Sequence, residues 1–189
     1  ALNPVVITQG FVAANSAGNT VLLGRGGSDT SAALLAGRLG AERVEIWTDV
    51  PGLFSADPRL IPGAKLLEKL EFAEALEMAA GGAKVIHPCC IRAAAETGTT
   101  IVIRDTGHPE FTGTCIMDLD DRYVGVKAVT CQKDMLVLLL QKIDSRREVG
   151  FLASVFDTFR QRGVSIDLVA TSETTTTVAL NRPANLLDD

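Results

Sequence analysis

A strand, a glycine turn, a helix and a second strand follow one another between residues 20 and 50, and this order constrains the fold most. TVLLG predicts a strand that runs into the turn GRGG, after which the apolar spacing becomes helical. Ser28 is placed to cap this helix and Gly40 to end it. RVEIWTDV predicts the next strand, so the unit is typical of a parallel or mixed α/β sheet. The residues expected on the buried face of the helix are Ala32, Leu35, Ala36 and Leu39.

Further elements flank this unit. VVITQGFVA predicts a strand before it, and helices are expected around EFAEALEMAAGGA and in CCIRAAAETG, followed by a strand in TIVIRDT. Between RVEIWTDV and the first of these helices lies PGLFSADPRLIPGA, a loop with three prolines. Loops of more than about 12 residues in compact domains are usually functional. This loop is therefore a candidate ligand loop.

The pattern restarts after GHPEFTGTCIMDLDD, a polar, turn-rich stretch that we interpret as a domain junction. VGVKAVTCQKDMLVLLLQ, SIDLVATSE and TTTTVALN predict strands, and the first two are separated by a helix. The apolar stripe of that helix is expected to be Leu152, Val155, Phe156 and Phe159. The order β-α-β-β is most of a split β-α-β unit. We predict two domains, residues 1–120 and 121–189.

Composition excludes several classes of protein. The 189-residue chain is 47% hydrophobic and 22% charged, which indicates a folded globular protein. Its net charge of −5, without a basic block, argues against a nucleic-acid partner. No apolar run reaches the length of a membrane span, and the first residues lack the basic start of a signal peptide. We expect a cytoplasmic protein with no membrane partner.

The cysteines and histidines provide little material for metal chemistry. Cys89, Cys90, Cys115 and Cys131 include no C-x-x-C pair, so reduced thiols are expected. With only two histidines, a metallohydrolase or a histidine-based triad is disfavoured. We predict no metal site made of protein ligands.

The glycine turn has a composition suited to a zwitterion. Gly24, Gly26 and Gly27 let backbone N–H groups approach a ligand, and the following helix directs its positive end at the same place. Arg25 fits a carboxylate, Asp29 an ammonium group or a catalytic lysine, and Ser28 either group. The alternative is a tight strand-to-helix connection whose glycines serve geometry alone. The spacing matches neither the P-loop nor G-x-G-x-x-G.

Four motifs in this order carry a resemblance: ITQGF, GRGGSDTSAALLA, WTDVPGLFSADPR and GAKVIHP. Together they closely resemble the C-terminal half of the catalytic domain of the aspartate kinases, within the amino acid kinase family. The resemblance covers residues 5 to about 104, and EVGFLASVFDTFRQRGVSIDLVATSE resembles the first ACT regulatory domain of these enzymes. It implies an α/β fold: half of a three-layer α/β/α sandwich, then a partial, ferredoxin-like ACT domain.

The resemblance implies transfer of the γ-phosphoryl group of ATP to the β-carboxylate of L-aspartate, with Mg²⁺ and without a covalent enzyme intermediate. It places aspartate on Arg25, Gly26, Ser28 and the catalytic Asp29. The nucleotide-binding residues that it implies are Thr48, Asp49, Phe54, Arg59 and Lys84.

Each of these residues also has an ordinary structural interpretation. Asp49 precedes Val-Pro and Asp57 precedes proline, where aspartate commonly begins a turn. Arg59 by itself would be a solvated loop charge, and Lys84 a lysine at a helix end. His87, before Pro88, is interpreted as structural. Only the joint match favours ligand contacts over these interpretations.

The sequence departs from the family pattern in two ways. Phe54 stands where many relatives have tyrosine, so a hydroxyl contact to the nucleotide is missing while ring packing is kept. The family's opening Lys-Phe-Gly-Gly-Thr-Ser-like motif does not occur in this sequence. That lysine would neutralise the transferring phosphoryl group. We therefore expect this chain to be an inactive fragment of a larger enzyme.

The ACT resemblance implies an effector amino acid bound across a subunit interface, and hence a homo-oligomer. Lysine is favoured over threonine as the effector by the VDL/TSE-like sequence, by resemblance only. The shorter connection that relatives have in place of RREV leaves the alignment of residues 144–149 open. Phe151 and Leu152 could equally be core residues. The residues implied for effector binding are Gly150, Phe151, Leu152, Ser165, Ile166, Asp167, Ser172 and Glu173.

Two other functions stay open at this point. One is another amino acid kinase, acting on glutamate, acetylglutamate or a nucleoside monophosphate, which GRGGSD and the ACT-like segment disfavour. The other is a regulatory fragment that binds an amino acid and assembles without catalysis.

Overall fold

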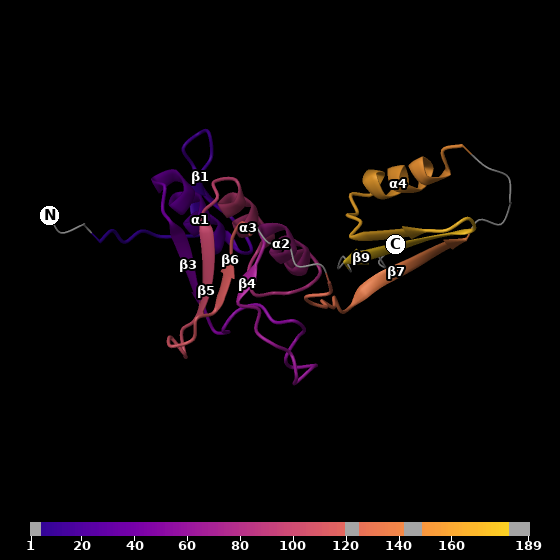
Figure 1. The fold of residues 1–189 in the computed structure, drawn as a ribbon. Helices are drawn as coiled ribbons and strands as arrows, with labels where there is room; N and C mark the ends of the chain where they lie inside the picture. Colours follow the sequence, from indigo (N-terminus) through magenta and orange to yellow (C-terminus); the bar gives the residue numbers. More distant parts are fainter. Residues whose placement is uncertain (1–4, 120–124, 142–148, 182–189) are drawn as a thin grey trace. The chain divides into compact units, whose positions relative to one another are not determined.

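The computed structural model describes residues 5–119, 125–141 and 149–181. The chain divides into two compact units, residues 1–131 and 132–189 (Figure 1). The predicted boundary between residues 120 and 121 falls outside the described part of the chain. Every helix among the described residues is too short or too polar to cross a bilayer.

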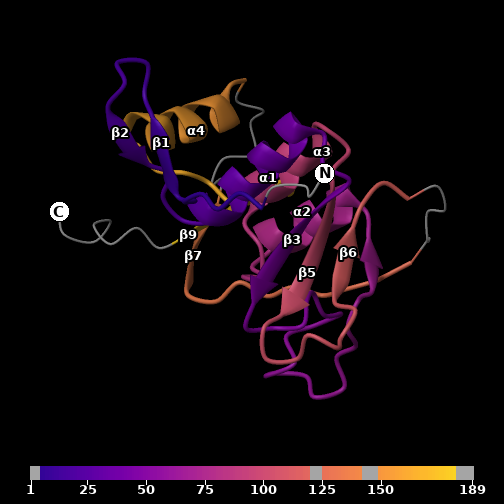
Figure 2. The same cartoon turned by 90° about the vertical axis from the view of Figure 1, so that its left-hand side faces the viewer.

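The first unit combines a small hairpin, a mixed sheet and helices. Its elements are β1 (Val12–Ala14), β2 (Thr20–Leu22), α1 (Gly27–Leu39), β3 (Arg43–Thr48), β4 (Lys69–Leu70), α2 (Phe72–Ala80), α3 (Pro88–Ala95), β5 (Thr100–Asp105) and β6 (Thr114–Ile116). The strands of the sheet follow the order β3-β5-β6-β4, and β3 and β5 run parallel. Helices α1, α2 and α3 lie on one face of this sheet (Figure 2). The predicted α/β class is confirmed.

Alternation along the parallel strands places the core under these helices. Val44 and Ile46 of β3, with Ile101 and Ile103 of β5, are buried, whereas the intervening side chains are exposed or half-buried. Burying one such aliphatic side chain contributes about 1.5–3 kcal/mol. The carboxyl ends of β3 and β5 pair Thr48 with Asp105, so both strands deliver their following loops to the same edge.

Helix α1 differs in detail from the prediction. It starts one residue after Gly26, whose left-handed backbone (φ 68°) makes it the N-cap, and Ser28 lies in the first turn. Gly40 ends it, as predicted. Ala33 and Ala36 are buried, but Leu39 is 81% exposed and Leu35 is 45% exposed. The prediction is therefore confirmed for Ala36 and for Ala32, which packs against the core, and wrong for the two leucines. α1 contacts α3 closely, and periodicity alone cannot rank small residues above leucine at such a contact.

Short strands account for the other differences in the first unit. Of the predicted strand VVITQGFVA, only the last two residues, Val12 and Ala13, belong to a ladder, which continues to Ala14 and has β2 as its partner; residues 5–10 have no strand partner among the described residues. β6 lies inside the stretch interpreted as a junction and pairs antiparallel with β5. Strands of two or three residues, such as β4 and β6, are too short to show a period in the sequence.

The second unit has the predicted β-α-β-β order. It contains β7 (Met135–Gln141), α4 (Phe151–Gln161), β8 (Leu168–Thr171) and β9 (Thr175–Asn181), with the antiparallel strand order β7-β9-β8. α4 lies over one face of the sheet (Figure 1). Val178 and Leu180 of the central strand are fully buried, and Val155, Phe156 and Phe159 of α4 are half-buried.

Candidate functional sites

The glycine turn presents an uncapped helix N-terminus. Gly24 and Gly26 both have positive φ angles, and the N–H of Gly27 donates to the carbonyl of Gly24 at 3.0 Å. No side chain of the described residues caps α1 at Gly26. The first N–H groups of a helix have no partner within the helix and carry its positive end. This turn can therefore accept an anionic group such as a carboxylate.

Three predicted aspartate ligands belong to the chain segment at this N-terminus. Arg25 lies in the turn and is exposed, Ser28 is exposed in the first turn of α1, and Asp29 beside it is half-buried. Burial raises the pKa of Asp29, and the nearby His87 opposes this effect without cancelling it. A partly desolvated carboxylate binds an incoming cation more strongly than a solvated one. The turn thus joins one cationic, one anionic and one hydroxyl side chain.

His87 is more involved in this site than the sequence interpretation implies. As predicted, it is structural: it caps α3, and its Nδ1 accepts the N–H of Cys89 at 3.2 Å. Its side chain also lies against the turn, because a Cβ built on Gly26 would lie 2.2 Å from the Cβ and 2.4 Å from the ring Cγ of His87. The sequence offered no signal for this contact, since the two residues are far apart in the chain.

The buried thiol of Cys90 lies close to the charge of Asp29. Burial raises the pKa of Cys90 to about 12, and Asp29 and Cys89 add to the increase. Cys90 therefore stays a neutral thiol at physiological pH and serves as an apolar packing group. All four cysteines are free.

The predicted nucleotide residues lie at the end of β3, in the loop that follows it and in one turn after α2. Thr48 ends β3, its hydroxyl donates to Asp49 at 3.2 Å, and its carbonyl accepts both the N–H and the hydroxyl of Thr106. Lys84 is exposed in the turn that follows α2. The carboxyl ends of strands are where ligands bind in α/β sheets. Thr48 and Asp49 stand at such an end.

Phe54 and Arg59 lie in the long loop after β3. Phe54 is half-buried and forms an antiparallel bridge with Leu66. The guanidinium of Arg59 is strongly exposed and forms an ion pair with Asp57 at 2.9 Å. A surface pair of this kind is weak and can open toward a ligand phosphate.

The described side chains do not form a metal centre on their own. No cluster of three or more histidine, cysteine, aspartate or glutamate residues that could hold a metal ion occurs in the described residues. The arrangement at Thr48 and Asp49 offers oxygen atoms that suit Mg²⁺ only in company with further ligands, such as nucleotide phosphates.

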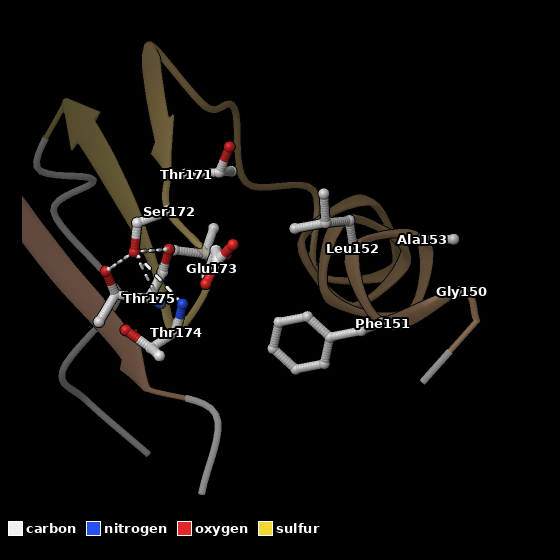
Figure 3. A pocket seen from close by; sticks show the side chains of 10 residues that line it. Gly150, Phe151, Leu152, Ala153, Thr171, Ser172, Glu173, Thr174 and Thr175 are labelled. Atoms are coloured by element: carbon white, nitrogen blue, oxygen red, sulfur yellow. Dashed lines mark hydrogen bonds between the residues drawn. The ribbon is translucent and has the colours of Figure 1, made fainter. Parts of the chain in front are cut away.

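The second unit contains an open pocket of about 360 Å³ between the start of α4 and the β8–β9 turn. In Figure 3, Phe151 and Leu152 project from α4 toward this turn, which carries Glu173. The N-cap of α4 is Gly150, which has a left-handed backbone (φ 91°), and no described side chain caps the helix. Ser172 is held by hydrogen bonds within the turn. The pocket thus combines a helix N-terminus, two apolar side chains and a carboxylate.

The structure separates the predicted effector residues into two groups. Gly150, Phe151, Leu152, Ser172 and Glu173 line the pocket. Ser165, Ile166 and Asp167 precede β8 and so lie at its opposite end, where Asp167 accepts the N–H of Asn181. One copy of the unit does not bring the two groups together.

The fold and the glycine turn define a class of protein. The sequence profile of the amino acid kinase family matches residues 1–105, and the chain belongs to this family. Among curated proteins, it is 39% identical over 177 residues to lysine-sensitive aspartokinase 3 of Escherichia coli, covering 94% of this chain and 39% of that protein. It is 40% identical over 173 residues to a bifunctional aspartokinase/homoserine dehydrogenase of Haemophilus influenzae, covering 91% and 21% respectively.

Solved structures of aspartokinases also resemble this chain. E. coli aspartokinase III in complex with aspartate and ADP, in the R-state, matches with a TM-score of 0.81 and 38% identity, over 95% of this chain and 40% of that one. The same enzyme with lysine and aspartate, in the T-state, matches with a TM-score of 0.71, 36% identity and coverage of 94% and 40%. The chain therefore spans about two fifths or less of the length of these relatives.

Proposed function

We propose that this chain is part of an aspartate kinase, which transfers the γ-phosphoryl group of ATP to the β-carboxylate of L-aspartate. The observation that carries the proposal is the turn at the start of α1, where Arg25, Ser28 and Asp29 surround an uncapped helix N-terminus. This set complements the carboxylate and ammonium groups of a free amino acid. Relatives named aspartokinase, one of them solved with aspartate and ADP, support it.

In this mechanism the turn holds and orients the acceptor. Arg25 and the N–H groups of α1 bind the α-carboxylate, Asp29 binds the ammonium group, and Ser28 donates to either carboxylate. The β-carboxylate oxygen then attacks the γ-phosphorus of ATP, and the bond to the β,γ-bridging oxygen breaks. The products are 4-phospho-L-aspartate and ADP. Catalysis comes from positioning and charge neutralisation, since the protein forms no covalent bond.

The nucleotide is assigned to Thr48, Asp49, Phe54, Arg59 and Lys84. Lys84 and Arg59 supply positive charge for the phosphates, while the half-buried ring of Phe54 offers apolar packing. Mg²⁺, bound mainly by the phosphates, would neutralise their charge and polarise the transferring group.

An assay of aspartyl hydroxamate tests the proposal. The full-length protein is expected to form the hydroxamate with ATP, Mg²⁺ and aspartate, and the 189-residue chain to form none, because the Lys-Phe-Gly-Gly-like motif is absent from it. Activity of the full-length protein on glutamate, acetylglutamate or a nucleoside monophosphate, with none on aspartate, would keep the family and refute the substrate.

The pocket of the second unit favours an additional function, binding of a regulatory amino acid by a partial ACT domain. We assign residues 1–120 to the catalytic part and 121–189 to the regulatory part. Lysine fits the pocket, since its carboxylate can bind the N-terminus of α4 and its side-chain ammonium group can reach Glu173. The group around Asp167 would come from a second copy, which makes the protein a homo-oligomer. A relative solved with lysine supports the choice. We place the protein in the cytoplasm.

Glu173→Gln is expected to weaken inhibition by lysine about tenfold or more in the full-length enzyme, because a charged hydrogen bond contributes about 1.5–3 kcal/mol. The measurement is the lysine concentration for half-inhibition. Asp157→Asn is the matched control, since Asp157 lies on α4 and pairs with Arg160 and Gln161. An unchanged lysine response in Glu173→Gln would remove Glu173 from the effector site.

A further inference from the structure

Backbone hydrogen bonds join residues 53–55 to residues 65–67 within the loop after β3, and we call this paired part the neck of the loop. The N–H of Leu67 donates to the carbonyl of Leu53, and the N–H of Ser55 donates to the carbonyl of Lys65, each at 2.8 Å. Together with the bridge from Phe54 to Leu66, these bonds join the two sides of the loop. They do not by themselves fix the loop against the sheet.

Thr114 of β6 attaches one side of this neck to the sheet. Its hydroxyl accepts the N–H of Leu53 at 2.9 Å, and both residues are buried, Thr114 fully. The approach is close at the preceding residue too, because a Cβ built on Gly52 would lie 2.2 Å from the Thr114 hydroxyl oxygen. A buried N–H that loses its acceptor destabilises the fold, so the Thr114 hydroxyl is needed as the acceptor for the Leu53 N–H.

A segment beyond β6 attaches the same side of the neck two residues further along, after Phe54. The N–H of Val129 donates to the carbonyl of Ser55 at 2.9 Å. The segment is itself fixed to α2, where Lys127 Nζ lies 2.6 Å from Glu74 Oε1. Burial raises the pKa of Glu74, but hydrogen bonds from Lys127 and from the Glu71 backbone outweigh it, and the net pKa is lowered. Glu74 is therefore ionised at neutral pH, and this anchor is an ion pair.

We propose that Thr114 and Val129 are positioning residues for nucleotide binding. They hold the loop at the residues immediately before and after Phe54. Both lie outside residues 1–105, the part that matches the family profile. They flank Phe54 directly, since Leu53 and Ser55 are its chain neighbours. The inference rests on the proposed function for the identity of the ligand, but the attachment of the loop can be measured without it.

The test uses kinetics of the full-length enzyme. Thr114→Val removes the acceptor at nearly constant volume and is expected to raise KM for ATP about tenfold, with kcat and KM for aspartate almost unchanged. Thr114→Ser keeps the hydroxyl and is expected to restore the wild-type KM. Thr99→Val is the matched control, because Thr99 is also buried and hydrogen-bonded but precedes β5, at the opposite end of the strands from the loop after β3. An equal rise of both KM values in Thr114→Val would refute the positioning role.

Hydrogen exchange of the loop separates this inference from the proposed function. Thr114→Val is expected to speed exchange of the Leu53 amide at least tenfold, whether or not aspartate is the substrate. Val129→Pro removes the second donor from a more exposed segment, and Val129→Ala, which keeps the N–H, is its control. Unchanged exchange of residues 53–55 in both Thr114→Val and Val129→Pro would overturn the inference. Altered exchange without any aspartate-dependent activity would refute only the substrate.

Discussion

Gly26→Ala is expected to destabilise the first unit by about 3 kcal/mol, which corresponds to a fall in Tm of about 6–12 °C. Two costs add. The left-handed backbone at φ 68° disfavours any side chain, and the new Cβ would lie 2.2 Å from the Cβ of His87. His87 cannot move aside freely, because its ring caps α3. Thermal unfolding of the 189-residue chain measures the effect.

Gly24→Ala is the matched control for this prediction. Gly24 has a similar positive φ of 73°, but a Cβ there meets no atom within 4 Å. Gly24→Ala should therefore lower the free energy of unfolding only by the cost of a side chain on a left-handed backbone, about 1–2 kcal/mol. Equal destabilisation by the two variants would show that the contact with His87 relaxes at little cost, and would contradict the tight fit inferred for the turn.

The same two variants are also expected to differ in the activity of the full-length enzyme. A displaced turn moves the N–H groups of α1 and the Arg25 side chain away from the acceptor, and misplacement by about 1 Å can cost about 100-fold in rate. Gly26→Ala is expected to lower kcat/KM for aspartate far more than Gly24→Ala does. Turnover with aspartate, measured for both variants, gives the ratio.

The sequence predicted the elements whose signals are local. The change of period at the glycine turn located α1, and the β-branched runs located β3 and β5, because each pattern extends over a whole element. β4 and β6 were missed because two or three residues show no period. On α1, the alanines of the predicted buried face were right and the leucines wrong for a tertiary reason, since the helix buries small residues where it contacts α3.

The candidate sites divide in the same way. Arg25, Ser28 and Asp29 are neighbours in the chain, so one motif could identify all three. The hydrogen bond between Thr114 and Leu53 of the loop after β3 joins residues 61 positions apart. The contact of His87 with Gly26 also joins residues far apart in the sequence. Such pairs follow from strand order and helix packing, which no motif of a single sequence states.

The two candidate ligand sites share one local feature, a glycine N-cap at the start of a helix. α1 and α4 each have as N-cap a glycine with a left-handed backbone, and no described side chain caps either helix. Serine or aspartate at these positions would satisfy the helix N–H groups internally. Glycine leaves them open to a ligand carboxylate, which both of the proposed ligands, aspartate and lysine, possess. Under the proposed function, the two sites differ in the side chains that bind the rest of the amino acid.

Asp29→Asn is expected to lower aspartate-dependent turnover of the full-length enzyme by about 10²–10³-fold while making the fold more stable at neutral pH. Activity falls because the ammonium group loses its anionic partner. Stability rises because burial of the Asp29 carboxylate, which raises its pKa above 3.8, makes the ionised form costly in the folded state. Asparagine is neutral and avoids this cost.

The sign of the pH dependence makes this prediction specific. Since the folded pKa of Asp29 is raised, the cost of its charge is present in full above that pKa and disappears as pH falls below 3.8, where the carboxyl is protonated in both states. The difference in Tm between Asp29→Asn and wild type should therefore be positive at pH 7 and vanish in acid. Asp49→Asn, at an exposed position, should leave Tm unchanged at both pH values. A loss of stability in Asp29→Asn at pH 7 would mean that the carboxylate serves the fold, through His87, rather than the substrate.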